Sequence, residues 1–158
     1  MGHDANGNIR QEIVDYIDQT LWAELATVRG DGTPVIRTIG AFGLDNGGSK
    51  VYFATFPGAD KTHHISSNNR VSLFFQHEGQ ELQTFRNAEI LGTAGKLTDE
   101  AEIKHAVTLI SERSPFVKEL IEKNGIEIFA YYQVTASEVK FLDYSKGIGP
   151  QAIEVITL

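Results

Sequence analysis

The sequence predicts a mainly β protein, an antiparallel β-barrel with flanking helices, and the order of its segments carries that prediction. Five segments with the residue content of strands precede the first long helical segment. The longest of them, residues 81–97, contains Gly92 and Gly95, which suit a bulge or the sharp coil of a barrel strand. Strands gathered ahead of the helices favour a barrel over a doubly wound sheet, in which the two alternate.

The amino-terminal part of the chain is predicted to form a helix and a β-hairpin. Between residues 9 and 21 an apolar residue recurs at every fourth position, which is typical of an amphipathic helix. Segments 24–29 and 34–40 are predicted strands, and Gly30-Asp31-Gly32 stands between them. Asp-Gly between two apolar runs is a strong hairpin signal.

The central part is predicted to run strand, turn, helix and strand. Residues 51–55 form the first strand, and the Pro-Gly pair within 56–59 makes the turn. A short helix is expected to open at Asp60 or Lys61, before a second strand at 71–75.

The carboxy-terminal third is predicted to contain one broken helix and three strands. Helical periodicity extends over residues 101–123, and Ser114-Pro115 interrupts it. Two strands at 126–134 and 137–144 are expected to follow, and a turn separates them from a short last strand at 152–156.

Length and composition indicate one soluble domain. The chain has 158 residues, 41% of them hydrophobic and 22% charged, and we predict a disordered segment over 1–8 and a single domain over 9–158. A net charge of -7 argues against a nucleic-acid partner. Because the chain contains no cysteine, disulfides, thiolate catalysis and cysteine-based metal sites are excluded. No apolar run has transmembrane length, so the expected location is the cytoplasm, away from membranes.

The segment around Lys61 is a candidate anion site. A helix start presents unpaired backbone N–H groups and the positive end of the helix dipole, so a turn ending at Gly58 with Lys61 just beyond it can receive a phosphate. The alternative is that Asp60 caps the same N–H groups and Lys61 points into water.

Arg37 is a second candidate cation. Strand alternation places it on the same face as the apolar Val35 and Ile39. An arginine on an apolar face is costly unless it is paired, so Arg37 either binds an internal carboxylate or is held for a ligand anion.

The ordered set of these segments resembles a known family, the pyridoxamine 5'-phosphate oxidase-like FMN-binding split barrels. The resemblance runs from about Ile9 to Leu97 and is looser beyond it. It rests on the ordered pieces LATV, GDGTPVIRTIG, VYFAT, a turn with Lys61, HHISSNNRVSLFF and RNAEILGTAGKL. In that family the fold is a six-stranded antiparallel split barrel, and two FMN molecules lie in clefts at a homodimer interface.

The resemblance also implies roles for individual residues. Arg37 and Lys61 match the positions that hold the FMN phosphate. Asn87, where the family's oxidases carry a glutamine, would reach the cofactor from the partner subunit. Two further segments would line the isoalloxazine ring and the ribityl chain, and their residues are Thr38, Ile39, Gly40, Phe53, Ala54 and Thr55.

Departures from the family pattern argue against pyridoxamine phosphate oxidation itself. The true oxidases usually carry an arginine immediately before the phosphate-binding lysine, where Asp60 stands here. Phe42 occupies the position of another lysine. The oxidases also end in a motif with an arginine and a histidine, and this chain ends in QAIEVITL with neither. The vitamin B6 substrate site is therefore largely absent.

The predicted function is that of an FMN-binding oxidoreductase whose substrate the sequence does not specify. Because the flavin carries the chemistry, no conventional catalytic residue needs to stand out. The alternatives are a non-catalytic flavin-binding electron carrier or stress protein, a haem-binding split barrel that uses a histidine, and a barrel that binds the deazaflavin F420.

The remaining candidates favour structural roles. The histidines at 63, 64 and 77 form no HExxH or His-x-His pattern, so no metal site is predicted and they are expected at the surface or as caps. Phe129, Tyr131 and Tyr132 are expected in the core or at the dimer interface.

Overall fold

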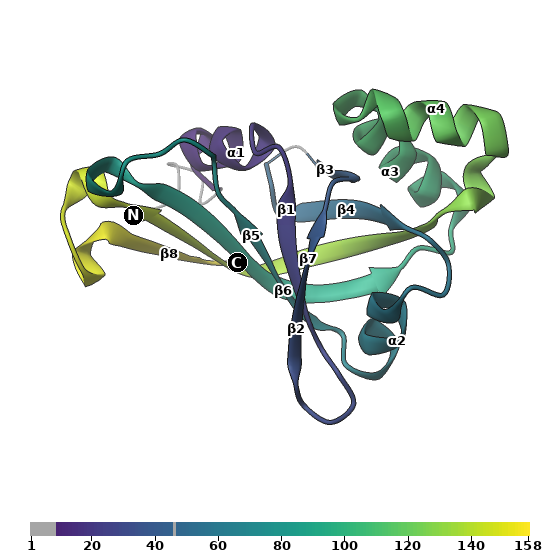
Figure 1. Cartoon of the computed structure of the whole chain (residues 1–158), viewed down its shortest axis with the longest axis horizontal. Helices are drawn as coiled ribbons and strands as arrows, with labels where there is room; N and C mark the ends of the chain where they lie inside the picture. Colours follow the sequence, from purple (N-terminus) through teal and green to yellow (C-terminus); the bar gives the residue numbers. More distant parts are fainter. Residues whose placement is uncertain (1–8, 46) are drawn as a thin grey trace.

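A single antiparallel sheet organises the chain in the computed structural model, which describes residues 9–45 and 47–158 (Figure 1). The predicted disordered segment 1–8 lies outside the described residues. The strands are β1 Ala23–Val28, β2 Pro34–Ile39, β3 Phe42–Leu44, β4 Lys50–Thr55, β5 Arg70–Phe75, β6 Arg86–Lys96, β7 Ala130–Asp143 and β8 Ile153–Thr157. The helices are α1 Gln11–Asp18, α2 Asp60–Ser67, α3 Glu100–Arg113 and α4 Pro115–Asn124.

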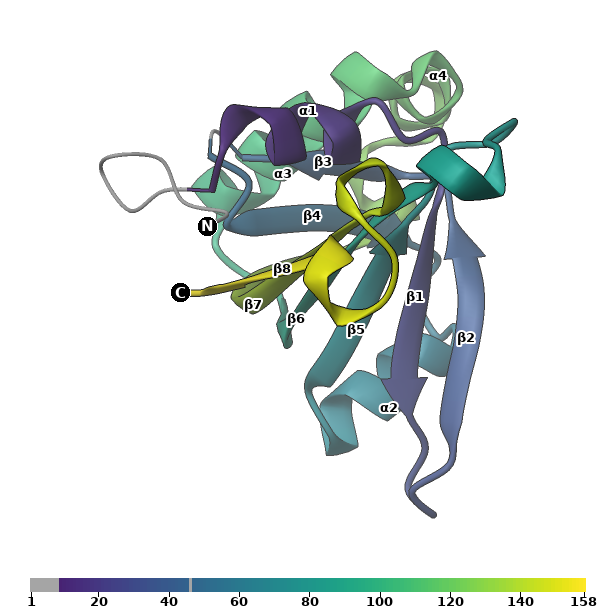
Figure 2. The same cartoon turned by 90° about the vertical axis from the view of Figure 1, so that its left-hand side faces the viewer.

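The sheet topology confirms the mainly β fold with flanking helices. Its hydrogen-bonded order is β2-β1-β5-β6-β7-β4-β3, with β8 on the far part of β7, and every pairing is antiparallel. The sheet has eight strands in the described part of the chain, whereas the resemblance implied six. The helices α1, α3 and α4 lie along one side, and α2 lies at the opposite end (Figures 1 and 2).

Several predicted boundaries are wrong, and the largest error concerns β7. The two strands expected at 126–134 and 137–144 are one continuous strand, and residues 126–128 form a 3-10 turn instead. The strand continues because the residues between the two segments stay in the ladder: Ala136 pairs with Gly92 and Glu138 with Leu91, and Ser137 of β7 is the extra residue of a bulge. The sequence predicted a bulge or a sharp coil of the strand at Gly92 and Gly95, and the structure has a bulge opposite Gly92 whose extra residue belongs to β7.

The helix boundaries follow local sequence signals. Asp99 caps α3 by accepting from the Glu102 N–H group, and the Ser114 side chain accepts from Val117 N–H at the start of α4. The prediction for the first helix extends too far, since α1 ends at Asp18. Leu21, assigned to its apolar stripe, is 60% exposed in the segment that leads into β1.

Two apolar clusters form the core, and they lie on opposite faces of β4 and β7, since successive residues of these strands alternate between them. The larger one packs α1 and the barrel strands together, and the smaller one joins β4 and β7 to α3 and α4. Phe129, Tyr131 and Tyr132 are all less than 10% exposed, which confirms their place in the core. Burial and the neighbouring Glu127 raise the pKa of Tyr131 to about 12, while its hydroxyl donates to the Ile126 carbonyl.

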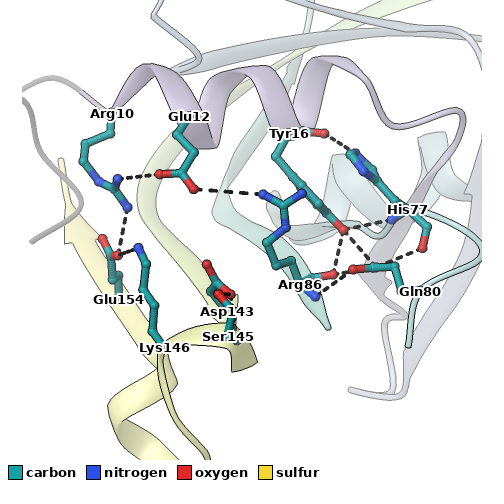
Figure 3. Close-up of polar contacts among 10 residues, drawn as sticks. All are labelled: Arg10, Glu12, Tyr16, His77, Gln80, Arg86, Asp143, Ser145, Lys146 and Glu154. Atoms are coloured by element: carbon teal, nitrogen blue, oxygen red, sulfur yellow. Dashed lines mark hydrogen bonds and ion pairs between the residues drawn. The ribbon is translucent and has the colours of Figure 1, made fainter. Parts of the chain in front are cut away.

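A polar network ties α1 to the barrel (Figure 3). The Tyr16 hydroxyl donates to the Arg86 carbonyl at 2.6 Å, and its ring stacks on His77 with centroids 3.7 Å apart. His77 Nε2 lies 2.7 Å from the Tyr16 carbonyl oxygen, and Gln80 bridges the His77 and Arg86 backbones. The Tyr16 carbonyl belongs to the last turn of α1, so His77 caps a helix-end carbonyl, in agreement with the expected surface or capping role, and also joins α1 to the segment after β5.

The bulge at Gly92 gives a direct test of the fold. A Cβ atom at this position would lie 2.0 Å from the Thr135 carbonyl oxygen, whereas a Cβ at Gly95 on the same strand meets nothing within 4 Å. We expect Gly92→Ala to lower the free energy of unfolding by about 3 kcal/mol or more. The backbone of β7 cannot move away from the added methyl group, because β7 is hydrogen-bonded to strands on both of its sides. Gly95→Ala is the matched control and should change it by less than about 1 kcal/mol. Equal effects in urea denaturation would contradict the close approach of the two strands.

Candidate functional site

The turn that leads into α2 leaves the helix start uncapped. Pro57 and Gly58 occupy the two central positions of a β-turn closed by Ala59 N–H donating to the Phe56 carbonyl, and the φ of +83° at Gly58 is typical of type II. The N-cap residue is Ala59, and no side chain caps α2. The alternative that Asp60 serves as the N-cap is therefore wrong, since Asp60 is the first helical residue.

Two cations lie next to this helix start. Lys61 is partly buried and donates from Nζ to the Thr55 hydroxyl oxygen at 2.8 Å. Arg37 donates from Nη1 to the Leu25 carbonyl oxygen across the β1–β2 ladder at 3.0 Å. Burial, followed by the nearby Arg37 charge, lowers the pKa of Lys61, and burial lowers the pKa of Arg37. Both cations thus pay a desolvation cost in the folded chain.

Neither cation forms an ion pair within the described ranges. No carboxylate oxygen of those residues lies within 4 Å of Arg37 or Lys61, and the nearby Asp60 only raises their pKa values from a distance. Of the two alternatives for Arg37, pairing with an internal carboxylate does not occur. The arrangement is two adjacent, partly desolvated positive charges beside an uncapped helix start, which is a favourable place for an anion.

His64 also belongs to this cluster. Its Nδ1 atom lies 2.8 Å from the hydroxyl oxygen of the buried Thr27 and 3.5 Å from Arg37 Nη2. The expected surface or capping role is wrong for this histidine, while His63 is exposed. One local signal could have indicated it, since His64 follows Lys61 by three residues and so shares its face of α2.

A pocket of about 590 Å³ opens beside the cluster. Its lining comes from the end of β2, the end of β4, the connection between α1 and β1, and the junction of α3 and α4. The lining residues are Gln19, Thr20, Leu21, Trp22, Thr38, Ile39, Gly40, Ala41, Ala54, Thr55, Phe56, Lys61, Arg113, Ser114, Pro115, Phe116, Val117, Leu120 and Phe129. The volume lies in the range of small-molecule sites.

Most residues expected to bind the cofactor line this pocket, and three do not. The lining residues of the expected set are Thr38, Ile39, Gly40, Ala54, Thr55 and Lys61. Arg37 is outside the lining, but its charge is near enough to lower the pKa of Lys61. The Phe53 side chain is buried in the core, where it stacks on Tyr132, and Asn87 lies half-buried on β6 opposite Leu142. Any contact of Phe53 with a ligand in this pocket would have to come from its backbone.

The opposite wall of the pocket contains residues that the sequence did not indicate. Arg113 is the best connected of them, since Nη2 donates to the carbonyls of Asp18 and Thr20 and Nη1 to that of Phe42. Its guanidinium also lies over the Phe42 ring, 3.9 Å from the centroid. Arg113 therefore joins α3 to the end of α1 and to β3, and fixes this wall.

Two other kinds of site receive no support from the described residues. They contain no group of three or more potential metal-ligating side chains close enough to hold an ion. None of their helices has the length and apolarity that a membrane crossing requires.

Comparison with known proteins identifies the family. The family model described as pyridoxamine 5'-phosphate oxidase matches residues 9–143. The chain belongs to this family. The match extends well beyond residue 97, where the resemblance seen in the sequence became looser. No curated protein sequence matches the chain.

Solved structures share this split-barrel fold at low sequence identity. A Clostridium acetobutylicum protein related to general stress protein 26 of B. subtilis has a TM-score of 0.67 at 16% identity, with coverage of 93% of this chain and 92% of that one. A Bacteroides thetaiotaomicron protein with a suggested role in 5-nitroimidazole antibiotic resistance has a TM-score of 0.70 at 17% identity, with coverage of 84% and 82%. A heme binding protein from Mycobacterium smegmatis has a TM-score of 0.71 at 16% identity, with coverage of 92% and 55%.

The wall held by Arg113 can be tested through stability. Arg113→Lys keeps the charge but cannot donate to three separate carbonyls, so we expect it to lower the free energy of unfolding by about 2 kcal/mol or more. Arg70→Lys, at an exposed position on β5, is the control and should stay within about 0.5 kcal/mol of the unmodified protein. Thermal and urea unfolding give both values. An Arg113→Lys variant with an unchanged free energy of unfolding would show that the three hydrogen bonds of the guanidinium are dispensable.

Proposed function

We propose that this chain binds FMN in the pocket beside Arg37 and Lys61 and acts as an FMN-dependent oxidoreductase. The observation that supports this most strongly is the pair of adjacent, partly desolvated cations without a carboxylate partner within 4 Å in the described ranges. A phosphate dianion would supply the missing negative charge, and the uncapped start of α2 would add backbone donors.

The residues around the pocket fit the other parts of the cofactor. Thr38, Ile39 and Gly40 offer backbone groups along the end of β2, and Ala54 and Thr55 do so at the end of β4. The Thr55 hydroxyl accepts from Lys61 and thereby holds the ammonium group at this end of the pocket. FMN supplies a ring that accepts and returns hydride or single electrons. The chain's own contribution is to bind and orient that ring and to limit its exposure to water.

The proposal includes a homodimer in the cytoplasm, with the cofactor at the subunit interface. Asn87 would then reach the FMN bound mainly by the partner. We expect Asn87→Ala to lower the flavin content of dimers, and in mixed dimers to affect only the site to which the variant chain contributes residue 87. Normal flavin content at that site would show that Asn87 acts within its own subunit or has no role.

The absorption spectrum of the purified protein tests the cofactor directly. Flavin bands, with FMN released on heating, would support the proposal. A colourless protein that takes up no added FMN would overturn it and leave the fold unaffected.

A haem site is the second candidate, because the fold is shared with a heme binding protein from Mycobacterium smegmatis. The geometry favours it less, since no histidine of the described residues lines the pocket and His64 and His77 are already bonded to protein groups. A Soret band in the same spectrum would decide for haem. Deazaflavin F420 would be distinguished by its own absorption and by its mass after heat release.

A non-catalytic electron carrier or stress protein would bind the same cofactor as an FMN-dependent enzyme but would not turn over a substrate. An enzyme should have its flavin reduced much faster by one donor, such as NADH or NADPH, than by others. A carrier should exchange electrons only with a protein partner, so stopped-flow reduction with a panel of donors separates the two.

The phosphate role of the two cations can be tested with a ligand pair that differs only by the phosphate. The unmodified protein should bind FMN at least about a hundredfold more tightly than riboflavin, because two charge-assisted contacts are lost without the phosphate. In Arg37→Met plus Lys61→Met this preference should disappear while riboflavin affinity is retained. Lys96→Met, at an exposed position on β6, is the control. An unfolded double variant would instead show that the cations serve stability.

The lowered pKa of Lys61 predicts a pH dependence of the same preference. Lys61 attracts a phosphate only while protonated, and burial makes it lose its proton at a lower pH than an exposed lysine. The ratio of FMN to riboflavin affinity should therefore fall as the pH rises through this lowered pKa. Lys61→Arg should keep the ratio constant, because arginine stays charged. Binding titrations between about pH 7 and pH 10 measure this affinity ratio. A ratio that stays constant with pH in the unmodified protein would contradict the assignment of Lys61 to the phosphate.

A further inference from the structure

The wall of the pocket that the cofactor proposal leaves unused is apolar. It is formed by the connection from α1 to β1 and by the start of α4, two segments that are far apart in sequence. Its large side chains are Leu21, Trp22, Phe116, Val117 and Leu120. The rings of Phe56 and Phe129, with centroids 5.1 Å apart, continue the same surface.

Several of these side chains are more exposed than their size would favour. Phe116 is 69% exposed, Phe56 is 58% exposed and Trp22 is 49% exposed. Leaving such rings in water is unfavourable, and a flat ligand that covered them would recover part of that free energy. Trp22 is also adjacent to the residues expected along the flavin, since a Cβ atom at Gly40 would lie 4.0 Å from Trp22 Cε3.

The charges around the pocket define which ligand this wall can take. No aspartate or glutamate is among the described lining residues, and the Glu24 carboxylate, which lies outside the lining, already accepts from the Thr38 hydroxyl, so a cation would find no counter-ion on the wall itself. The cations present are Lys61, which the phosphate would use, and Arg113, whose donors are committed to backbone carbonyls and to Asp18. A ligand on the apolar wall therefore gains nothing from carrying a charge.

We propose that the wall between Trp22 and Phe116 binds a flat, uncharged, ring-containing molecule, as a second ligand next to the cofactor. The position beside a cofactor rests on the proposed function, while binding to the wall itself does not. A small molecule suits the wall better than a protein segment does, because the wall belongs to a pocket of about 590 Å³ with convergent apolar sides.

The chain carries its own probe of this site. Trp22 is its one tryptophan, so intrinsic fluorescence reports on the wall directly. In protein freed of any flavin, titration with menadione, an uncharged bicyclic ring, should quench Trp22 with saturation. N-methylquinolinium, a bicyclic ring with a positive charge, should bind at least about tenfold more weakly, because the wall offers no carboxylate.

Two variants identify the binding surface. Phe116→Ala should weaken menadione binding about tenfold, the size expected for one lost aromatic contact. Leu82→Ala is the matched control, since Leu82 is similarly exposed, at 73%, but lies outside the pocket. Both positions are on the surface, so neither variant is expected to unfold. Flavin binding by Leu82→Ala, measured separately by absorbance, should stay within about twofold of the unmodified protein.

The outcomes separate this proposal from the proposed function. Normal FMN binding without saturable menadione quenching, or with equal effects of the two variants, would overturn the second-ligand proposal alone. Menadione binding without FMN binding would overturn the proposed function and leave the wall as a binding site. A Trp22 emission maximum that shifts with protein concentration and resists quenching would overturn the proposal in favour of a second copy of the chain covering the wall.

Discussion

The ladder along β7 is the constraint on which the arrangement of the site depends. This strand pairs with β4 and β6 in its first half and with β6 and β8 in its second. It can run unbroken because a bulge opposite Gly92 takes up one extra residue of β7 and lets β6 stay paired on both sides of it. The pairing of Thr55 with Ala130 fixes where β4 ends, and the turn and α2 follow at once. The position of Lys61 is therefore set by backbone hydrogen bonds of the sheet, which are hard to displace.

On that rigid frame the chain holds an electrostatic arrangement that is unfavourable by itself. Arg37 and Lys61 are partly desolvated, and the Arg37 charge disfavours protonation of its neighbour. Their hydrogen-bond partners, the Leu25 carbonyl and the Thr55 hydroxyl, are neutral. A structural role alone would be served better by a carboxylate, which would compensate both charges. Local departures from favourable pairing are typical of sites that await a ligand.

The sequence indicated the barrel half of the site and missed the helical half, for a physical reason. Strand alternation placed Arg37 on the inner face, and the Pro-Gly turn placed Lys61 at a helix start, because both signals are local. Trp22, Arg113 and Phe116 come together only through packing of α3 and α4 on the barrel, which periodicity does not encode. The same limit explains Leu21, whose spacing fits the α1 stripe although the helix ends earlier, and His77, whose partner Tyr16 is distant in sequence. The strands at 126–134 and 137–144 were separated because the bulge within β7, with Ser137 as its extra residue, depends on pairing with β6, which is distant in sequence.

The two halves of the pocket have different origins and different chemistry. The barrel strands and α2 contribute fixed positive charge and backbone groups, and the α1–β1 connection with the start of α4 contributes aromatic surface. Arg113 connects the halves by bonding the end of α1 and the Phe42 carbonyl of β3 from α3. Because the charged half depends on sheet register and the apolar half on helix packing, the second can change without disturbing the first. A family member can therefore keep the features expected for a phosphate-bearing cofactor, as this chain does, while Asp60 and Phe42 stand where the oxidases of the family carry an arginine and a lysine.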